Sequence, residues 1–164
     1  MNKIDFANKY YPLAKEAGEK YNLNPVVILA QAAHESGWGD SYGARIRRNF
    51  FGVIAAGKPN AYWKGEKNQS TASGLWFRVY PSAQDSISDF ARLITSSNNY
   101  NDAEKVSFDT PAYAKAIAYS PYISETNGDN RPAYEKAVRD NADFFSKILG
   151  PQILRDQGKK KSDC

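Results

Sequence analysis

The 164-residue chain has very few of the residues that build disulfides and metal centres. It holds a single cysteine, Cys164, and a single histidine, His34. One cysteine cannot close an internal disulfide, so the fold does not depend on an oxidising compartment. One histidine and one distant cysteine do not make a ligand set for a metal such as zinc, and we expect neither a metal nor a cofactor.

Long apolar runs are also missing. No stretch approaches the ~18 apolar residues that cross a membrane, so we expect no membrane insertion. The first residues, Met1–Phe6, lack the apolar core of a signal peptide, which predicts synthesis in the cytoplasm without a route of its own to the outside. The net charge is only +4 and no recognised nucleic-acid-binding motif is present, so we expect no nucleic-acid partner.

What the sequence does have is a carboxylic acid at the end of an apolar helix. Pro25 behind an Asn24 cap predicts a helix that runs to Ser36 and ends at Gly37. Apolar residues occupy every face of this helix, so we expect it in the core. Glu35 then emerges from the core at a helix C-terminus, where burial and the helix dipole both disfavour its ionised form.

A carboxylic acid that is still protonated near neutral pH is the group with which a glycosidase protonates a leaving oxygen. Glu35 is therefore a candidate general acid. The alternative, which this motif alone leaves open, is a glutamate that only caps a core helix.

Further motifs follow in a fixed order along the chain. They are Glu35–Asp40 (ESGWGD), Asn49–Val53 (NFFGV), Trp63–Gly65 (WKG), Phe77–Ser82 (FRVYPS) and Ala118–Tyr122 (AYSPY). In this order they resemble the N-acetylglucosaminidases of glycoside hydrolase family 73, which act on peptidoglycan. Phe51 and Val53 stand where the family pattern has Leu and Ile. The resemblance spans about residues 20–147 and looks closest to the single-domain forms of phages and prophages.

The resemblance implies an α+β, lysozyme-like fold, predominantly helical with a small β-hairpin lobe flanking a cleft. The residue pattern agrees, because it predicts helices at 4–21, 25–36, 82–96, 110–119 and 131–149, and a hairpin within 61–80. Gly150–Pro151 should stop the last helix. We expect a monomer with one catalytic domain over residues 1–150, followed by a polar, flexible tail at 151–164.

Most glycosidases pair the general acid with a second carboxylate. Family members often carry it in the hairpin, but Ser70–Ser73 has no acid at the matching place. Glu66 is the only carboxylate between Asn49 and Tyr80 and is our candidate for this role, with an exposed turn residue as the alternative. If Glu66 does not reach the cleft, three alternatives stay open for the second catalytic group. The substrate's own 2-acetamido group could assist, Tyr and Asn side chains could hold the attacking water, or the domain could be a weak hydrolase.

The resemblance supplies one more candidate, and the position of other side chains near the expected cleft supplies the rest. Tyr119 matches a family tyrosine beside the acid and is a candidate catalytic residue, with a half-buried helix-end tyrosine as the alternative. Trp63 and Tyr122 are candidate substrate-binding residues, Trp63 by stacking on a sugar. Asn49 could bond either the loop backbone or an N-acetyl group. Trp38 should be structural and wedge the loop after Glu35.

His34 invites a catalytic role because it precedes Glu35 in the sequence. Adjacent helical residues point about 100° apart, however, so the two side chains do not share a face. We expect His34 in the core or behind the residues that touch the substrate.

The function that we predict is an endo-β-N-acetylglucosaminidase that cleaves β-1,4 glycan linkages of cell-wall peptidoglycan with Glu35 as general acid. In a phage or prophage it would be a bacteriolytic endolysin, which reaches the wall by assisted, holin-type release or as part of a virion. Two alternatives stay open: a lytic transglycosylase, which needs only one acid, and a non-catalytic domain that binds the wall or belongs to a virion.

Overall fold

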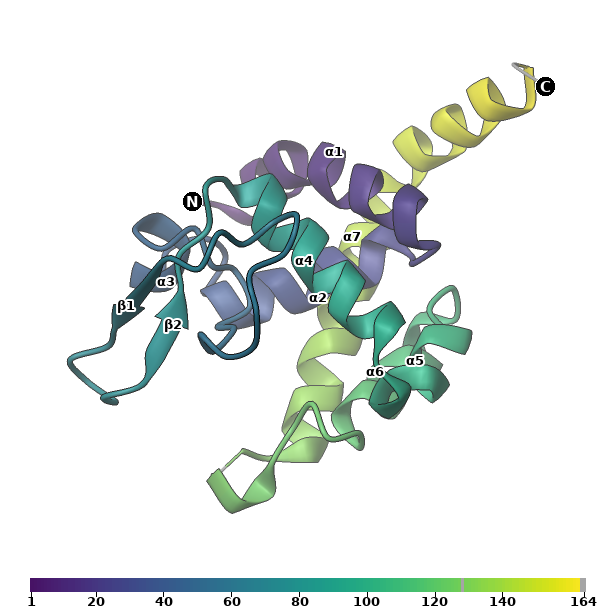
Figure 1. The fold of residues 1–164 in the computed structure, drawn as a ribbon. Helices are drawn as coiled ribbons and strands as arrows, with labels where there is room; N and C mark the ends of the chain where they lie inside the picture. The colour runs from purple at the N-terminus through teal and green to yellow at the C-terminus, as the bar shows by residue number, and fades with distance from the viewer. Residues whose placement is uncertain (128, 163–164) are drawn as a thin grey trace.

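The computed structural model describes residues 1–127 and 129–162, so Cys164 lies outside the described residues. The helices are α1 (Lys3–Tyr21), α2 (Pro25–Ser36), α3 (Tyr42–Arg45), α4 (Ala83–Ser96), α5 (Asn101–Lys105), α6 (Thr110–Ala118) and α7 (Arg131–Ser162), with short 3-10 turns at Asn98–Tyr100 and Glu125–Asn127. Strands β1 (Lys67–Gln69) and β2 (Trp76–Arg78) pair antiparallel. Figure 1 shows this hairpin at one edge of the helical body and the end of α7 at the opposite edge.

Four of the predicted helices agree with α1, α2, α4 and α6 to within one residue at each end, and the predicted hairpin contains β1 and β2. These segments carry their own start and stop signals. The Asn2, Asn24, Ser82 and Asp109 side chains each accept a hydrogen bond from a backbone N–H in the first turn of the helix that follows. The predicted mixture of helices with one small hairpin is confirmed.

Helix α2 lies at the centre of the fold and packs against α1, α4, α6 and α7. Every residue from Val26 to Ala33 is buried, which confirms the prediction of a core helix. The helix ends because Gly37 adopts a left-handed conformation with φ +56°, and its N–H bonds to the carbonyl of Ala33. The last turn of α2 leaves the core at this point.

The hairpin is tied to α4 by the buried carboxylate of Asp89. One of its oxygens accepts hydrogen bonds from Arg78 Nη1 (2.8 Å) and the Tyr80 hydroxyl (2.5 Å). The other accepts from Arg92 Nε (2.9 Å) and Asn60 Nδ2 (3.0 Å). A buried carboxylate is stable only when it is paired and hydrogen-bonded in this way. Asp89 thereby fixes the hairpin lobe relative to the helices.

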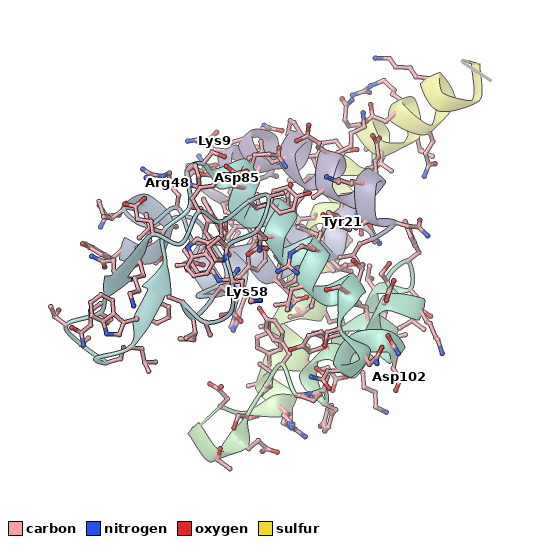
Figure 2. All side chains as sticks on the ribbon, in the orientation of Figure 1. Lys9, Tyr21, Arg48, Lys58, Asp85 and Asp102 are labelled. Atoms are coloured by element: carbon pink, nitrogen blue, oxygen red, sulfur yellow. The ribbon has the colours of Figure 1, made fainter. Side chains whose placement is uncertain are left out.

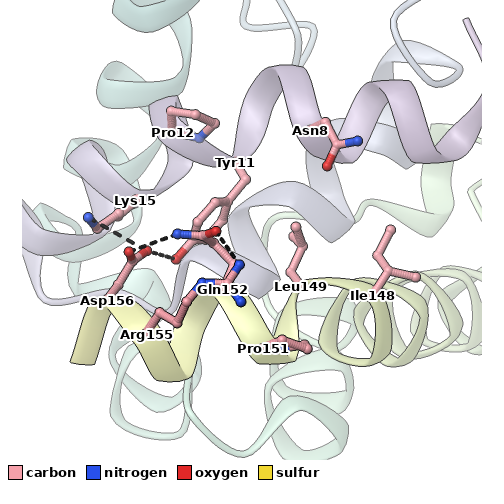
Figure 3. Close-up of a pocket in the computed structure, with 10 residues that line it drawn as sticks. All are labelled: Asn8, Tyr11, Pro12, Lys15, Ile148, Leu149, Pro151, Gln152, Arg155 and Asp156. Atoms are coloured by element: carbon pink, nitrogen blue, oxygen red, sulfur yellow. Dashed lines mark hydrogen bonds and ion pairs between the residues drawn. The ribbon is translucent and has the colours of Figure 1, made fainter. Parts of the chain in front are cut away.

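The predicted end of the last helix at residue 149 was wrong, because α7 continues through Gly150 and Pro151. Proline removes only one helical hydrogen bond, and contacts with α1 stabilise the turns that follow it. The Tyr11 hydroxyl donates to Asp156 Oδ2 (2.8 Å), and Lys15 Nζ lies 3.6 Å from the same oxygen. Figure 3 shows these side chains lining a cavity of about 470 Å³ between α1 and α7.

Charged side chains of both signs surround the fold. Lys9, Arg48, Lys58 and Asp102, which Figure 2 labels, are all exposed. Within residues 1–127 and 129–162, no helix combines the length and the apolar character that crossing a membrane requires.

The Asp89 cluster predicts that Asp89→Asn destabilises the protein by about 3–5 kcal/mol, because it leaves the buried Arg78 guanidinium without its charge partner. Urea unfolding followed by circular dichroism measures this difference. Asp140→Asn is the control: it removes an exposed partner of Lys136 and should change the unfolding midpoint very little. Equal midpoints for Asp89→Asn and the wild type would contradict the role of Asp89.

Candidate active site

Glu35 lies in the last turn of α2, on the wall of a cavity of about 390 Å³. The other lining residues come from His34, loop 51–54, helix α4, Tyr100, segment 121–123, Asp129 and Tyr134. Many of these residues are aromatic or aliphatic, and the Glu35 side chain among them is half-buried. Segments distant in sequence thus meet at one acidic side chain.

The turn after Glu35 is fixed by polar and aromatic contacts. Ser36 Oγ donates to the carbonyl of Ala32 (2.6 Å) and accepts from the N–H of Gly39 (2.9 Å). The Trp38 ring centroid lies 5.4 Å from those of Phe6 and Phe145. The expectation that Trp38 is structural is confirmed, since its ring anchors this turn to α1 and α7.

A chain of buried hydrogen bonds leads from the core to Glu35. The Tyr113 hydroxyl donates to Gln31 Oε1, and Gln31 Nε2 donates to the Tyr134 hydroxyl (3.0 Å). Because the Tyr134 oxygen accepts from Gln31, its own proton is available for the hydrogen bond with the Glu35 carboxyl group. Gln31 lies one turn before Glu35 on the same face of α2. The network therefore orients the carboxyl group from behind.

Burial raises the pKa of Glu35 from 4.5 to about 7. The hydrogen bond from Tyr134 stabilises the carboxylate and lowers this pKa, whereas the negative charge of Asp129 raises it. Among the described residues, Asp129 is the only other carboxylate that lines the cavity. Glu35 can thus hold a proton near neutral pH and donate it to a ligand in the cavity.

His34 is exposed on the cavity wall, and its ring lies edge-on to Tyr134 with centroids 5.1 Å apart. Its expected place in the core was wrong, because α2 has already left the core at this turn. Partial desolvation lowers the pKa of the imidazole below its ordinary value. Across residues 1–127 and 129–162, we find no group of three or more His, Cys, Asp or Glu side chains that could hold a metal.

The structure does not bring Glu66 to Glu35. The Glu66 side chain is exposed and lines neither of the cavities to which Glu35 belongs. Its backbone carbonyl accepts hydrogen bonds from Trp63 Nε1 (2.7 Å) and the N–H of Val79 (2.9 Å), which places it in the frame of the hairpin. This placement fits the alternative that the sequence left open, in which Glu66 is an exposed turn residue.

Trp63 was expected to stack on a sugar, and this placement was wrong. Its side chain is buried, and the Arg78 guanidinium carbon lies 4.2 Å from its ring centroid. The indole thus packs against the arginine that Asp89 holds, and no face is left for a ligand. Trp76 on β2 is the exposed indole of this lobe.

Asn49 bonds the loop backbone, one of the two roles that its sequence position left open. Its Nδ2 donates to the carbonyls of Val53 and Arg78, and its Oδ1 accepts from the N–H of Val53, each at 3.0 Å. All of its amide hydrogens and one oxygen lone pair are therefore engaged. Asn49 shapes the loop beside Glu35.

Of the two predicted tyrosines, only Tyr122 lines the cavity of Glu35. Its ring centroid is 6.1 Å from that of Tyr134. Tyr119 is half exposed and lines a different cavity beside α5 and α6, so the expected place next to the acid was wrong. Tyr122 and Tyr134 are the tyrosines positioned to act with Glu35.

Comparison with known proteins identifies the family of the chain. The family described as mannosyl-glycoprotein endo-beta-N-acetylglucosaminidase matches residues 11–147. Peptidoglycan hydrolase FlgJ of Vibrio parahaemolyticus is 27% identical over 133 residues, which cover 73% of this chain and 42% of that protein. Peptidoglycan hydrolase FlgJ of Escherichia coli (strain K12) is 35% identical over 104 residues, 53% of this chain and 31% of that protein. The chain spans less than half the length of these relatives.

Among solved structures, the glycoside hydrolase domain of FlgJ from Salmonella typhimurium aligns with a TM-score of 0.69 at 24% identity, covering 100% of both chains. At this identity the likeness concerns the fold alone. It confirms the predicted lysozyme-like fold, in which helices and a small hairpin flank a cleft.

The raised pKa of Glu35 predicts a pH-dependent loss of stability. Between pH 4.5 and pH 7 the folded carboxyl group keeps a proton that the unfolded chain has released, so stability falls as the pH rises through this window. The Glu35→Gln variant has no carboxyl group to titrate at this position, so it lacks this pH-dependent loss of stability. Its advantage over the wild type should grow by about 1–2 kcal/mol between pH 4 and pH 8, after allowance for partial solvent contact.

Urea unfolding of both proteins at the two pH values measures this difference, and Glu66→Gln at an exposed site is the matched control. An advantage of Glu35→Gln that does not change with pH would contradict a protonated Glu35.

The neighbours of Glu35 predict shifts of its pKa in opposite directions. Tyr134→Phe should raise the pKa, because the carboxylate loses a hydrogen-bond donor, and Asp129→Asn should lower it, because a nearby negative charge is removed. Infrared difference spectra follow the band of the protonated carboxyl group and measure the pKa shift in each variant. The band of Glu35 is identified by its absence in Glu35→Gln. Shifts of the same sign in the two variants would show that these contacts do not control the acid.

Proposed function

We propose that the chain is a glycoside hydrolase acting on peptidoglycan. The premise is that the chain belongs to the glucosaminidase family, whose model matches residues 11–147. The observation that carries this proposal is Glu35, a half-buried acid with a pKa of about 7 on the wall of an open cavity. The relatives named peptidoglycan hydrolase support the choice of substrate. A polymer of N-acetylated sugars also suits a cavity lined by tyrosines and apolar side chains.

In the proposed reaction, Glu35 donates its proton to the oxygen of the glycosidic bond as that bond breaks. The carboxylate that remains accepts the hydrogen bond from Tyr134, which stabilises it as the charge develops. Because Tyr134 is itself held by Gln31 and Tyr113, this stabilisation needs no rearrangement at the moment of reaction. The activity should therefore fall as the pH rises above about 7, when Glu35 loses its proton.

Asp129 is our candidate for the second carboxylate, in place of Glu66. It lines the same cavity as Glu35 from the segment that precedes α7. In this position it can activate a water molecule or stabilise the positive charge that develops on the sugar ring. The substrate's own 2-acetamido group is the alternative, and Asp129→Asn distinguishes the two, because assistance by the substrate does not need Asp129.

The glycosidic bond that we infer to be cleaved is the one that leaves a reducing N-acetylglucosamine end, as in an endo-β-N-acetylglucosaminidase. A lytic transglycosylase would need Glu35 alone and would leave anhydro-muramyl ends, while a binding domain would release no fragments. The phage or prophage setting, release by a holin-type route and the monomeric state stay predictions, since the fold and the site would be the same in other settings.

Glu35→Gln is predicted to lower the rate of glycan cleavage by about 100- to 10,000-fold, the usual effect of losing a general acid, while binding to walls is retained. Mass spectrometry of the soluble fragments from purified peptidoglycan measures cleavage and identifies the new ends. Glu66→Gln is the matched control and should stay within about twofold of the wild type, because its side chain lies outside the cavity.

Anhydro-muramyl ends from the wild type would reassign the enzyme to the transglycosylases. Full activity of Glu35→Gln would remove Glu35 from the reaction.

A further inference from the structure

Arg47 is a buried arginine that has no acidic partner among the residues that the structure describes. Its side chain precedes the Asn49 loop, and the residue is only 8% exposed. Its Nε donates to Asn68 Oδ1 at 2.8 Å. For the part of the chain that the structure describes, neither Nη1 nor Nη2 makes a hydrogen bond or an ion pair. Neither atom is among the fully enclosed polar atoms that lack a partner, so both face open space. A largely buried guanidinium group with two such open N–H edges can bind an anion from outside the chain.

The guanidinium group is held in one orientation by the hairpin and α3. Its central carbon lies 4.8 Å from the ring centroid of Tyr42 and 5.0 Å from that of Phe77. Phe77 pairs with Asn68 across the two strands, so the stacking ring and the hydrogen-bond acceptor come from one rigid unit. The two rings and the Nε contact leave Nη1 and Nη2 as the unpaired edge of the group. This edge is the one with which arginine binds a carboxylate through two parallel hydrogen bonds.

Arg47 lines a second, smaller cavity of about 100 Å³ that also contains Glu35. Nη1 lies 3.9 Å from the point where a side chain at Gly43 would begin, and Gly43 lines the same cavity. Glu35 and Gly52 line both this cavity and the larger one. The two cavities therefore meet at the carboxyl group of Glu35. Gly52 has φ +62° and open space where a side chain would stand, so the junction is unobstructed.

The two cavities differ in size. The one at Arg47 has a volume of about 100 Å³ and the larger one about 390 Å³. We therefore expect a sugar ring of the ligand in the larger cavity and a short substituent of that ring in the smaller one. A substituent in the smaller cavity can bind Arg47 if it carries an acidic group.

We propose that Arg47 binds a carboxylate carried by the glycan strand, in a subsite on the far side of Glu35 from the larger cavity. This inference rests on the proposed action on peptidoglycan. In that polymer a carboxylate comes either from the lactyl group of a muramic acid that has lost its peptide or from the peptide itself. The small volume of the cavity favours the lactyl group. Arg47 then acts as a specificity residue that selects strands with a free carboxylate next to the bond to be cleaved.

The test uses the wild-type protein and chemically matched substrates. Glycan strands freed of peptide are compared with the same strands after their lactyl carboxylates are converted to methylamides, and with strands that keep their peptides. We expect kcat/KM to fall about 10- to 100-fold on amidation, as for the loss of a charge-assisted pair of hydrogen bonds. Equal kcat/KM for free and amidated strands would overturn the proposal.

The third substrate identifies the source of the carboxylate. Faster cleavage of the peptide-free strands assigns the subsite to the lactyl group. Faster cleavage of peptide-bearing strands, lost when the peptide carboxylates are amidated, assigns it to the peptide and overturns the lactyl assignment. A wild type that cleaves none of the strands refutes the proposed function itself, which separates that failure from a failure of the Arg47 inference.

Variants supply an independent measurement. Arg47→Gln should lower kcat/KM for free-carboxylate strands and leave that for amidated strands unchanged, and Arg47→Lys should restore part of the difference. Arg45→Gln is the control, since Arg45 is exposed and bonds only the carbonyl of Asp40 (3.0 Å). An equal loss on both substrates would show that Arg47 merely supports the hairpin, and would contradict the proposal.

Discussion

The burial of helix α2 is the constraint on which the site depends. A helix that is apolar on every face can lie only in the core, and its last turn then leaves the core at a fixed point. Glu35 lies at that point. Its burial disfavours the ionised carboxylate, yet its side chain still lines the cavity and can contact a ligand. The same burial that stabilises the fold thus sets the pKa of the acid near 7. Stability and chemistry oppose each other at this side chain, as is common at catalytic sites.

The parts of the cavity around Glu35 are held by separate polar contacts. Gln31 links α2 to Tyr134 on α7, and Asn49 shapes the loop beside the acid. Asp89 ties the hairpin to α4 through four hydrogen bonds and so sets the distance between the hairpin lobe and the helices. In each contact a buried polar side chain is satisfied by groups from distant segments, which makes the geometry of the cavity a property of the whole fold.

The sequence predicted what local signals determine. The Asn24 cap of α2, the bounds of α1, α4 and α6 to within one residue, the position of Glu35 and the structural role of Trp38 all follow from neighbouring residues. The ordered motifs identified family 73 correctly. Gln31 carried a further signal that was overlooked, because a lone amide within an apolar helix has to find a buried partner.

Contacts between distant segments could not be predicted. Tyr134 and Asp129 reach Glu35 only because α7 packs on α2, and nothing near them in the sequence indicates this. Trp63 and Tyr119 were carried over from motifs that match in sequence order but do not specify burial. The extension of α7 beyond Pro151 depends on contacts with α1, which outweigh the local preference of proline to end a helix.

The most direct test of this account is a carbon-13 NMR titration of the Glu35 carboxyl group in the wild-type protein. The account predicts an apparent pKa of about 7, well above the ordinary value of 4.5. A measured value near 4.5 would mean that the acid is ionised and solvated at neutral pH. It could not then serve as the proton donor, and the central claim would be wrong.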